Sequence, residues 1–214
     1  MHLWLPSDIH AVAIDEDLVF LDLASDTYFC LTNAAALLAL QDDGAVTAQK
    51  AEAAEPLIEA GLLVRDPAQA KMPPPARPRV GLFTTTRALS PRALTRALRA
   101  NKAAAAAFEA LTFQQLLALA EDPDSAATGG AEQEATLAEA ARFVRMAPWL
   151  PKDGACFMRS LQQLLYLRTY GHRPRWVIGV RTWPFEAHCW LQQGDVVLDD
   201  QVEHVQAFTP ILAV

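Results

Sequence analysis

The sequence lacks most features that mark secreted, membrane-spanning or metal-dependent proteins. Its 214 residues include only three cysteines, which form neither a disulfide framework nor a zinc-binding spacing. No apolar run approaches the roughly 20 residues that cross a bilayer. The first residues have neither the charged region nor the long apolar region of a signal peptide. We therefore expect a cytoplasmic protein without membrane insertion.

Further absences narrow the chemistry. The five histidines show no His-Glu-x-x-His pattern and no ligand cluster, so we expect no metal. No Gly-rich phosphate-binding loop is present, and we expect no cofactor. The net charge of −7 argues against nucleic acid as a partner. What is present, 52% hydrophobic and 20% charged residues, suits a folded core.

A proline-rich run divides the chain, with prolines at positions 67, 73, 74, 75 and 78. Such a run behaves as a semi-rigid spacer. A chain of this length holds one large domain or two small ones, and typical domain sizes slightly favour two. We predict a first domain over residues 1–66, a linker over 67–80 and a second domain over 81–214.

The first domain shows the pattern of three short strands followed by helices. The strands are expected at Ala11–Ile14, Leu18–Leu23 and Thr27–Leu31. Helices are expected from about Asn33 to Leu40 and between residues 46 and 60, ending at Gly61. This order predicts a small winged-helix-like module, and no acids, histidines or thiols are grouped in it as a site.

The first part of the second domain reads as helical. Ser90 and Pro91 are a plausible N-cap and first-turn pair for an Ala-rich helix that continues towards Leu119. The segment 121–131, which contains Pro123 and two adjacent glycines, should break it before another helix over 133–146.

The residues with the clearest chemical meaning lie in the last third of the chain. The apolar spacing after Cys156 predicts a helix that begins at or near this residue. Backbone amides and the positive end of the dipole at a helix N-terminus lower the pKa of a thiol. An imidazole that takes the thiol proton, and a carboxylate that orients the imidazole, would complete a catalytic triad. His188 and the adjacent acids Asp199 and Asp200 are the candidates.

The hairpin that carries these residues leaves two choices for the acid. Strands are expected at residues 176–180, 187–192 and 196–200, and a turn centred on Gly194 would place Asp200 opposite His188, within reach of its imidazole. A two-residue turn of Gln193 and Gly194 would instead bring Asp199 opposite. We favour Asp200 and keep Asp199 as the alternative.

The other two cysteines are expected to be small buried hydrophobes. This is the ordinary role of Cys30 and Cys189 in a protein without disulfides. Because Cys189 follows His188 directly in a strand, its side chain should point to the opposite face of the sheet.

The order Cys, His, Asp resembles the transglutaminase-like cysteine peptidase fold, with Ala187-His188-Cys189-Trp190 on a strand and Val197-Leu198-Asp199-Asp200 after a turn. Residues from about 140 to 214 more closely resemble the B proteins of lasso peptide biosynthesis, which remove the leader from a ribosomally made precursor. The resemblance implies Cys156 as nucleophile, His188 as base and Asp200 as orienting acid. Cys189 departs from the family, which usually has a small residue such as Ala there.

The N-terminal stretches Leu18–Leu23 and Ser25–Asn33 resemble a precursor-recognition element related to the peptide chaperone of pyrroloquinoline quinone synthesis. Such elements bind a leader peptide as an added strand, through main-chain hydrogen bonds and alternating side chains. The resemblance implies that the leader lies along the edge formed by Thr27, Tyr28, Phe29, Cys30 and Leu31.

Together these observations predict an α+β protein. A winged-helix-like recognition domain is followed by a transglutaminase- or papain-like domain of helices and an antiparallel sheet. The predicted activity is that of a lasso leader peptidase, and the implied partners are the leader peptide and an ATP-dependent, asparagine-synthetase-like cyclase. Two alternatives remain open: an acyltransferase that uses the same triad, and a peptide-binding adaptor without catalysis.

Overall fold

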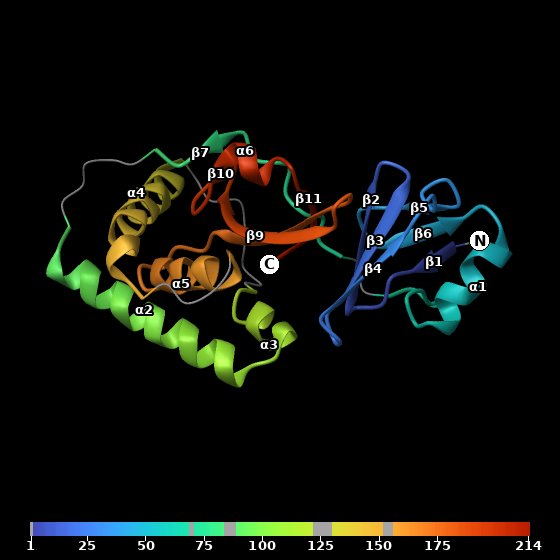
Figure 1. Ribbon diagram of the computed structural model, residues 1–214, viewed down its shortest axis with the longest axis horizontal. Helices are drawn as coiled ribbons and strands as arrows, with labels where there is room; N and C mark the ends of the chain where they lie inside the picture. The colour runs from blue at the N-terminus through green and yellow to red at the C-terminus, as the bar shows by residue number, and fades with distance from the viewer. Residues whose placement is uncertain (1, 69–70, 84–88, 122–129, 152–155) are drawn as a thin grey trace. The chain divides into compact units, whose positions relative to one another are not determined.

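The computed structural model describes residues 2–68, 71–83, 89–121, 130–151 and 156–214 (Figure 1). The chain divides into two compact units. The first comprises Met1–Pro74, Val180–Glu186 and Thr209–Ala213, and the second comprises Pro75–Gly179, Ala187–Phe208 and Val214. In the described part of the chain, no helix is both long and apolar enough to cross a membrane.

The first unit contains two three-stranded sheets, with strand orders β2-β3-β4 and β1-β6-β5. The three predicted strands are present as β2 (Ile9–Ile14), β3 (Asp17–Asp22) and β4 (Thr27–Leu31), all antiparallel. The second sheet consists of β1 (His2–Trp4), β5 (Leu38–Leu40) and β6 (Ala45–Ala48), and α1 (Ala51–Glu59) follows it. Gly61 has a φ of 74° just after α1, consistent with its predicted role in ending the helix.

The middle strand of the first sheet is covered on both faces. Leu18 and Phe20 are fully buried, and so are Val19 and Leu21, which alternate with them along β3. By contrast, Phe29, which pairs with Phe20 across the sheet, is 40% exposed. Strand β4 is an edge strand of its sheet, and part of its apolar surface is exposed to solvent.

The predicted helix from Asn33 to Leu40 is not formed. The chain turns at Asn33, which has a φ of 56°, and continues into β5, where Leu38 pairs with Ala48 of β6. The helix propensity of the Ala-Leu run is only a few tenths of a kcal/mol per residue. Burial of Leu38 in the core and the ladder with β6 outweigh it.

The strands that carry the candidate triad belong to a five-stranded sheet with the order β11-β8-β9-β10-β7. The strands are β7 (Val80–Gly81), β8 (Arg175–Arg181), β9 (Glu186–Gln193), β10 (Val196–Val197) and β11 (Thr209–Ala213). Strands β9 and β10 are antiparallel, but β7 pairs with β10 in parallel, so the predicted antiparallel sheet is wrong at this edge.

Helices α2 (Pro91–Ala110), α3 (Phe113–Ala118), α4 (Gly130–Met146) and α5 (Cys156–Arg168) belong to the second unit. Ser90 caps α2 as predicted, its hydroxyl accepting the Ala93 N–H. The helix does not run on to Leu119, because Leu111 is extended and Thr112 starts α3 with a capping box. Most of the predicted break over 121–131 lies outside the described residues.

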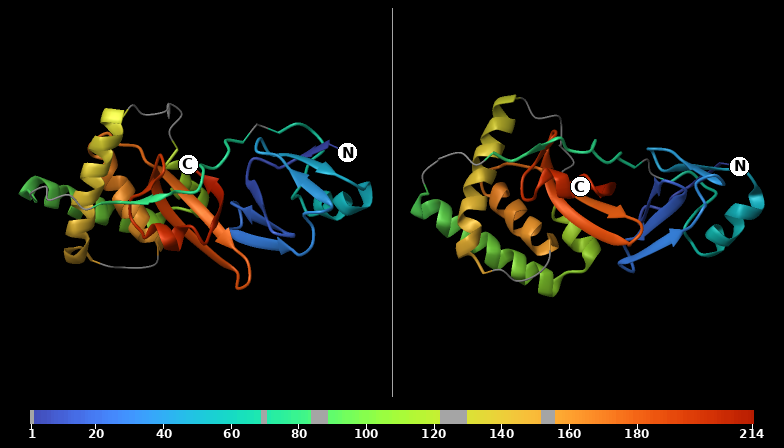
Figure 2. Two further views of the ribbon diagram at one scale, coloured as in Figure 1. Left: turned by 90° about the horizontal axis from the view of Figure 1, so that it is seen from above. Right: turned by 45° about the horizontal axis from the view of Figure 1, so that its top comes forward.

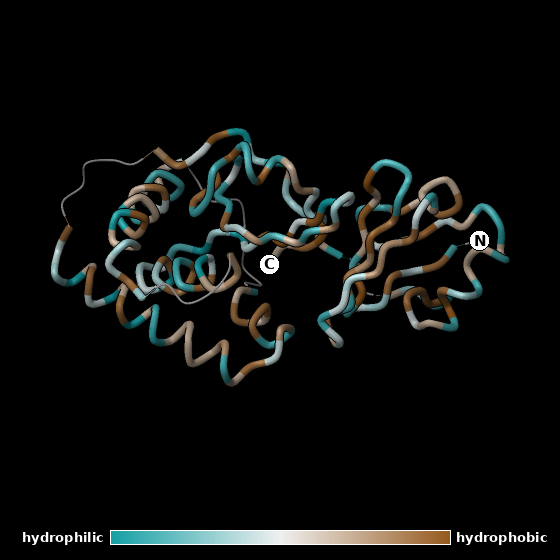
Figure 3. The backbone as a smooth tube through the Cα atoms, viewed as in Figure 1, coloured by the Kyte–Doolittle hydropathy of each residue, from teal (hydrophilic) through white to brown (hydrophobic). Residues whose placement is uncertain are grey.

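The Ala-rich sequence of α2 is explained by close helix packing. Hydrophobic and hydrophilic residues alternate along α2 (Figure 3). A stripe of small buried side chains runs along one face of the helix. The stripe consists of Ala93, Ala97, Ala100 and Ala104. It packs towards α5, and α5 in turn lies between α2 and the sheet (Figures 1 and 2).

Candidate active site

Helix α5 holds Cys156 at its first residue, as the apolar spacing predicted. Two glutamine side chains hydrogen-bond this helix to neighbouring segments of the chain. Gln162 donates to the Asn101 side chain of α2 at 2.9 Å, and Gln163 donates to the Leu198 carbonyl at 3.1 Å. Leu161 and Leu164 of the same helix are fully buried. A candidate nucleophile therefore sits at the start of a rigidly packed helix, where free amides and the helix dipole favour a thiolate.

Ser160 ties the first turn of α5 to strand β8. Its hydroxyl accepts from the Trp176 indole N–H at 2.8 Å and lies 3.0 Å from the carbonyl oxygens of Cys156 and Phe157, to which it can donate. The Phe157 ring packs on Trp176 with 4.5 Å between centroids. Sequence analysis did not identify Ser160, because nothing along the chain marks a serine one turn after a cysteine as a structural link.

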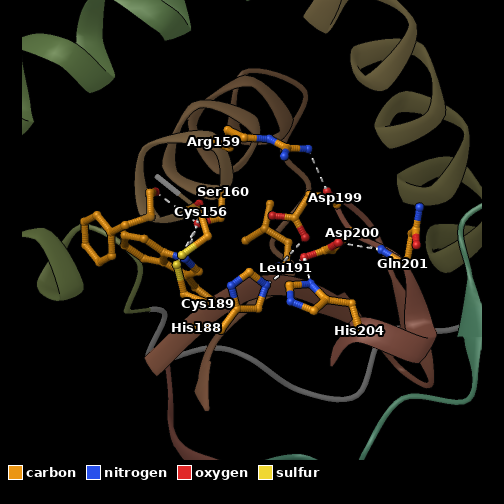
Figure 4. Close-up of polar contacts among 12 residues, drawn as sticks. Cys156, Arg159, Ser160, His188, Cys189, Leu191, Asp199, Asp200, Gln201 and His204 are labelled. Carbon is orange, nitrogen blue, oxygen red and sulfur yellow. Dashed lines mark hydrogen bonds and ion pairs between the residues drawn. The ribbon is translucent and has the colours of Figure 1, made fainter. Parts of the chain in front are cut away.

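His188 lies on β9 with 8% of its surface exposed, beside Cys156 and hydrogen-bonded to Asp200 (Figure 4). Its Nε2 is 2.7 Å from Asp200 Oδ2. This leaves Nδ1 as the ring nitrogen available to the Cys156 thiol, whose proximity helps to raise the pKa of His188. Cys156, His188 and Asp200 are thus brought together from a helix, a strand and the segment after a strand.

The hairpin register differs from the predicted one. Val196 pairs with Gln193 and Val197 with Gln192, so the turn consists of Gly194 and Asp195, and the ladder is shifted by one residue. Strand β10 also ends at Val197 instead of continuing to residue 200. Asp200 therefore reaches His188 from beyond the strand end, and the cross-strand argument for this pair was wrong although the pair itself is hydrogen-bonded.

The side chain of Asp199, the alternative acid, is hydrogen-bonded to the backbone and not to His188. Its Oδ1 accepts the Leu191 N–H of β9 at 2.9 Å. Burial raises the pKa of this carboxyl to about 7, and the bond from Leu191 offsets only part of that increase. The carboxylate that holds the imidazole is that of Asp200, while Asp199 fastens the chain to the neighbouring strand.

A second histidine contacts the orienting acid. His204, on α6 (Val202–Val205), places Nδ1 3.0 Å from Asp200 Oδ2, and its ring centroid lies 4.6 Å from that of His188. Among the described residues, His188, Asp200 and His204 form a group whose ligand atoms lie within 4.8 Å of one another and could hold a metal ion. The sequence predicted no such cluster, since only the fold brings His204 beside the acid.

Hydrogen bonds set the charge state of the site. The Cys189 thiol lowers the pKa of Cys156, burial opposes this, and His188 lowers it further, to about 4. Burial disfavours a charged imidazole, but bonds to Asp200 and Cys156 outweigh it and raise the pKa of His188 to about 9. Burial likewise disfavours ionised Asp200, yet its bonds from His188, the Gln201 amide and His204 hold its pKa well below the ordinary value. Near neutral pH the site is a thiolate–imidazolium pair supported by a carboxylate.

The two other cysteines differ from each other and from expectation. Cys30 is exposed on edge strand β4, where an edge position leaves one side uncovered, so the prediction of a buried residue was wrong. Cys189 is buried as predicted, with 5% exposed, but its side chain points toward that of Cys156 (Figure 4) and lowers the pKa of that thiol. The expectation that it points away from the site was therefore wrong.

The five candidate peptide-binding residues form β4 in the first unit, while the triad candidates belong to the second. Phe29 and Cys30 are exposed, and Thr27, Tyr28 and Leu31 are half-buried. The Tyr28 ring packs against Phe185 of the same unit at 5.5 Å. The structure thus places all five residues in one edge strand.

A cavity of about 480 Å³ lies in the second unit, and Asp199 and Asp200 are among its lining residues. Arg159, Gln162 and Asp200 are among its polar lining residues, and Phe143, Pro148 and Leu198 are among its apolar ones. Arg159 also donates to the Asp199 carbonyl at 3.3 Å. The cavity offers mixed polar and apolar walls within reach of the orienting carboxylate.

A cysteine at a helix start, bonded to a strand histidine that an aspartate orients, is the arrangement of thiol-dependent hydrolases and acyl-transfer enzymes. A family model of the transglutaminase-like superfamily matches residues 75–213, and the chain belongs to this superfamily. Its domains are usually cysteine proteases or acyltransferases. No curated protein and no solved structure matched the chain.

Proposed function

We propose that this protein is a cysteine peptidase that removes the leader from a lasso peptide precursor. The observation that carries the proposal is the grouping of Cys156, whose pKa is lowered, with His188 and the Asp200 carboxylate hydrogen-bonded to it. The same chain also contains a separate unit whose sheet ends in strand β4. The superfamily supplies the class of chemistry. The resemblance of residues 140–214 to lasso B proteins supplies the substrate.

The proposed reaction is ordinary thiol acyl transfer to water. The Cys156 thiolate attacks the carbonyl of the last leader residue, and the His188 imidazolium protonates the departing amine of the core peptide. His188 then accepts a proton from water, which attacks the thioester and releases the leader. Asp200 keeps the imidazole oriented and stabilises its charged form throughout.

The proposed recognition step uses β4. An extended peptide can add to the outer strand of a sheet as a further strand, through main-chain hydrogen bonds. Thr27–Leu31 form the outer strand of their sheet, and the exposed Phe29 offers apolar contact to one face of the added peptide. A leader held on the first unit raises the effective concentration of the scissile bond at the thiol, because both belong to one chain.

The product of the proposed reaction needs a second enzyme. Cleavage frees the N-terminal amine of the core, and joining this amine to an Asp or Glu side chain requires an activated carboxyl. By resemblance, an ATP-dependent, asparagine-synthetase-like cyclase performs this step. We propose that this cyclase is the functional partner of the peptidase.

The direct test is mass spectrometry of a candidate precursor incubated with the wild-type chain and with Cys156→Ala, each with and without the cyclase. We expect leader release at one bond by the wild type and none by the variant. A product ligated to an added amine, in place of hydrolysis, would identify an acyltransferase. Binding without cleavage in every condition would identify an adaptor.

A further inference from the structure

A second thiol lies against the candidate nucleophile. Cys189 follows His188 on β9, is 5% exposed, and its sulfur faces that of Cys156 at the start of α5 (Figure 4). The same sulfur lies 3.4 Å from Ser160 Oγ. Ser160 also contacts the Cys156 carbonyl, so one small network surrounds both thiols.

The triad is complete without this thiol. His188 supplies the base and Asp200 the orienting acid, while the helix start already favours an ionised Cys156. Cys189 does more than fill space, because its side chain points at the nucleophile and lowers the pKa of that thiol. A second thiol in contact with a reactive thiolate is, however, what allows an oxidised cysteine to be captured as a disulfide.

We propose that Cys156 and Cys189 are an oxidative modification site, in which Cys189 resolves peroxide-oxidised Cys156 to a reversible disulfide that switches the enzyme off. The proposal concerns the thiol pair alone and holds whether the substrate is a leader peptide or another acyl donor. Cys30, on β4 of the first unit, takes no part in it.

The reaction balances in two steps with hydrogen peroxide as oxidant. The Cys156 thiolate attacks one peroxide oxygen, the O–O bond breaks, and the departing hydroxide takes a proton to become water, leaving a sulfenic acid. The Cys189 sulfur then attacks the sulfenic sulfur, the S–O bond breaks, and the hydroxide leaves as water with the Cys189 proton. Two reducing equivalents from an added dithiol restore both thiols.

Geometry and burial make this outcome specific. A disulfide requires the sulfurs to approach to about 2.05 Å, and the Cys156 and Cys189 side chains already point toward each other (Figure 4). Capture also stops Cys156 short of sulfinic and sulfonic acids, which dithiols do not reduce. Burial of Cys189 hides it from bulky reagents but not from the adjacent sulfur.

The experiment treats the reduced full-length chain with hydrogen peroxide, blocks remaining thiols with an alkylating reagent, and maps peptides by mass spectrometry without reduction. We expect a linked pair of peptides containing Cys156 and Cys189, lighter by two hydrogen atoms than the reduced pair. Added dithiol should restore alkylation of Cys156. These readouts need no substrate, so they stand apart from the leader-cleavage test.

Two variants complete the design. Cys189→Ser keeps a hydrogen-bond donor beside Cys156 but cannot resolve a sulfenic acid, so Cys156 should proceed to acids that dithiol does not reverse. Cys30→Ser is the matched cysteine control and should leave the 156–189 link unchanged. Two results would overturn the proposal. One is that dithiol restores Cys156 alkylation equally well in wild type and Cys189→Ser, and the other is a wild-type peptide map without the 156–189 disulfide. The wild-type map decides the matter even if Cys189→Ser folds poorly.

Discussion

The two units of this protein offer different kinds of chemistry. The first presents backbone at the edge of a sheet, with a partly exposed Phe29, and its buried His10 has a pKa lowered to about 3 by burial and by Lys71. The second gathers a thiol, an imidazole and carboxylates whose pKa values all shift. Main-chain edges suit binding of an extended peptide, and clustered ionisable side chains suit bond cleavage. The comparison predicts that binding and turnover can be separated by substitution.

The largest effect should come from Cys156→Ala. Removal of the sulfur leaves no nucleophile, so leader release should fall to background, while leader affinity measured by fluorescence anisotropy stays within about twofold, since a few tenths of a kcal/mol is typical for changes away from a contact. Loss of affinity together with cleavage would mean that the two units do not divide the work as proposed.

The next largest effect should distinguish the two acids. Asp200→Asn removes the charge that stabilises the His188 imidazolium, and kcat/KM should fall by about 10²- to 10⁴-fold. Asp199→Asn keeps an oxygen that can accept a hydrogen bond from the Leu191 N–H, so kcat/KM of this variant should fall by less than about tenfold. The two aspartates are adjacent in the sequence, and both substitutions replace a carboxylate with an amide of the same shape. Each variant therefore serves as the control for the other. A larger effect at Asp199 would contradict the assignment of the orienting acid.

A smaller effect should separate the first unit from the second. Phe29→Ala shortens an exposed side chain on the proposed binding edge, and leader affinity should weaken by about 5- to 30-fold, as for loss of a good apolar contact. Leu37→Ala is the matched control, because Leu37 is 41% exposed in the same unit but lies outside β4. The change should appear in KM, with kcat preserved. If both variants weakened leader affinity equally, the proposal that the leader binds along β4 would be contradicted.

The pH dependence should belong to the second unit. Below about pH 4 the Cys156 thiolate is protonated, and above about pH 9 His188 loses the proton that the leaving amine needs, so kcat/KM should follow a broad bell between these values. Leader affinity should stay flat over pH 5–8, since His10 remains neutral there.

The smallest expected change is a displacement of the acidic limb of that bell. Cys189→Ala removes the neighbouring thiol, which contributes most to the lowered pKa of Cys156, so this limb should move to higher pH. The rate of Cys156 alkylation against pH provides the same measurement without substrate. An unmoved limb would show that His188 and the helix start suffice to ionise the thiol.

Several elements were predictable because their signals are local. The strands β2, β3 and β4, the Ser90 cap and the start of α5 at Cys156 follow from alternation, capping chemistry and apolar spacing within a few residues. The helix expected at residues 33–40 failed because a ladder with β6 and burial of Leu38 outweighed a weak propensity. Local signals succeed where no distant partner competes for the same residues.

The sequence alone determined the residue types available for chemistry, the helix start that favours a thiolate, and the transglutaminase-like family of residues 75–213. The tertiary structure decided which atoms meet. It set a hairpin register one residue from the predicted one and let Asp200 reach His188 from beyond the end of β10. It also placed His204 on the acid and the Cys189 thiol on Cys156. These contacts form by packing and hydrogen bonding between separate elements. They produce no periodic pattern in the sequence from which they could be predicted.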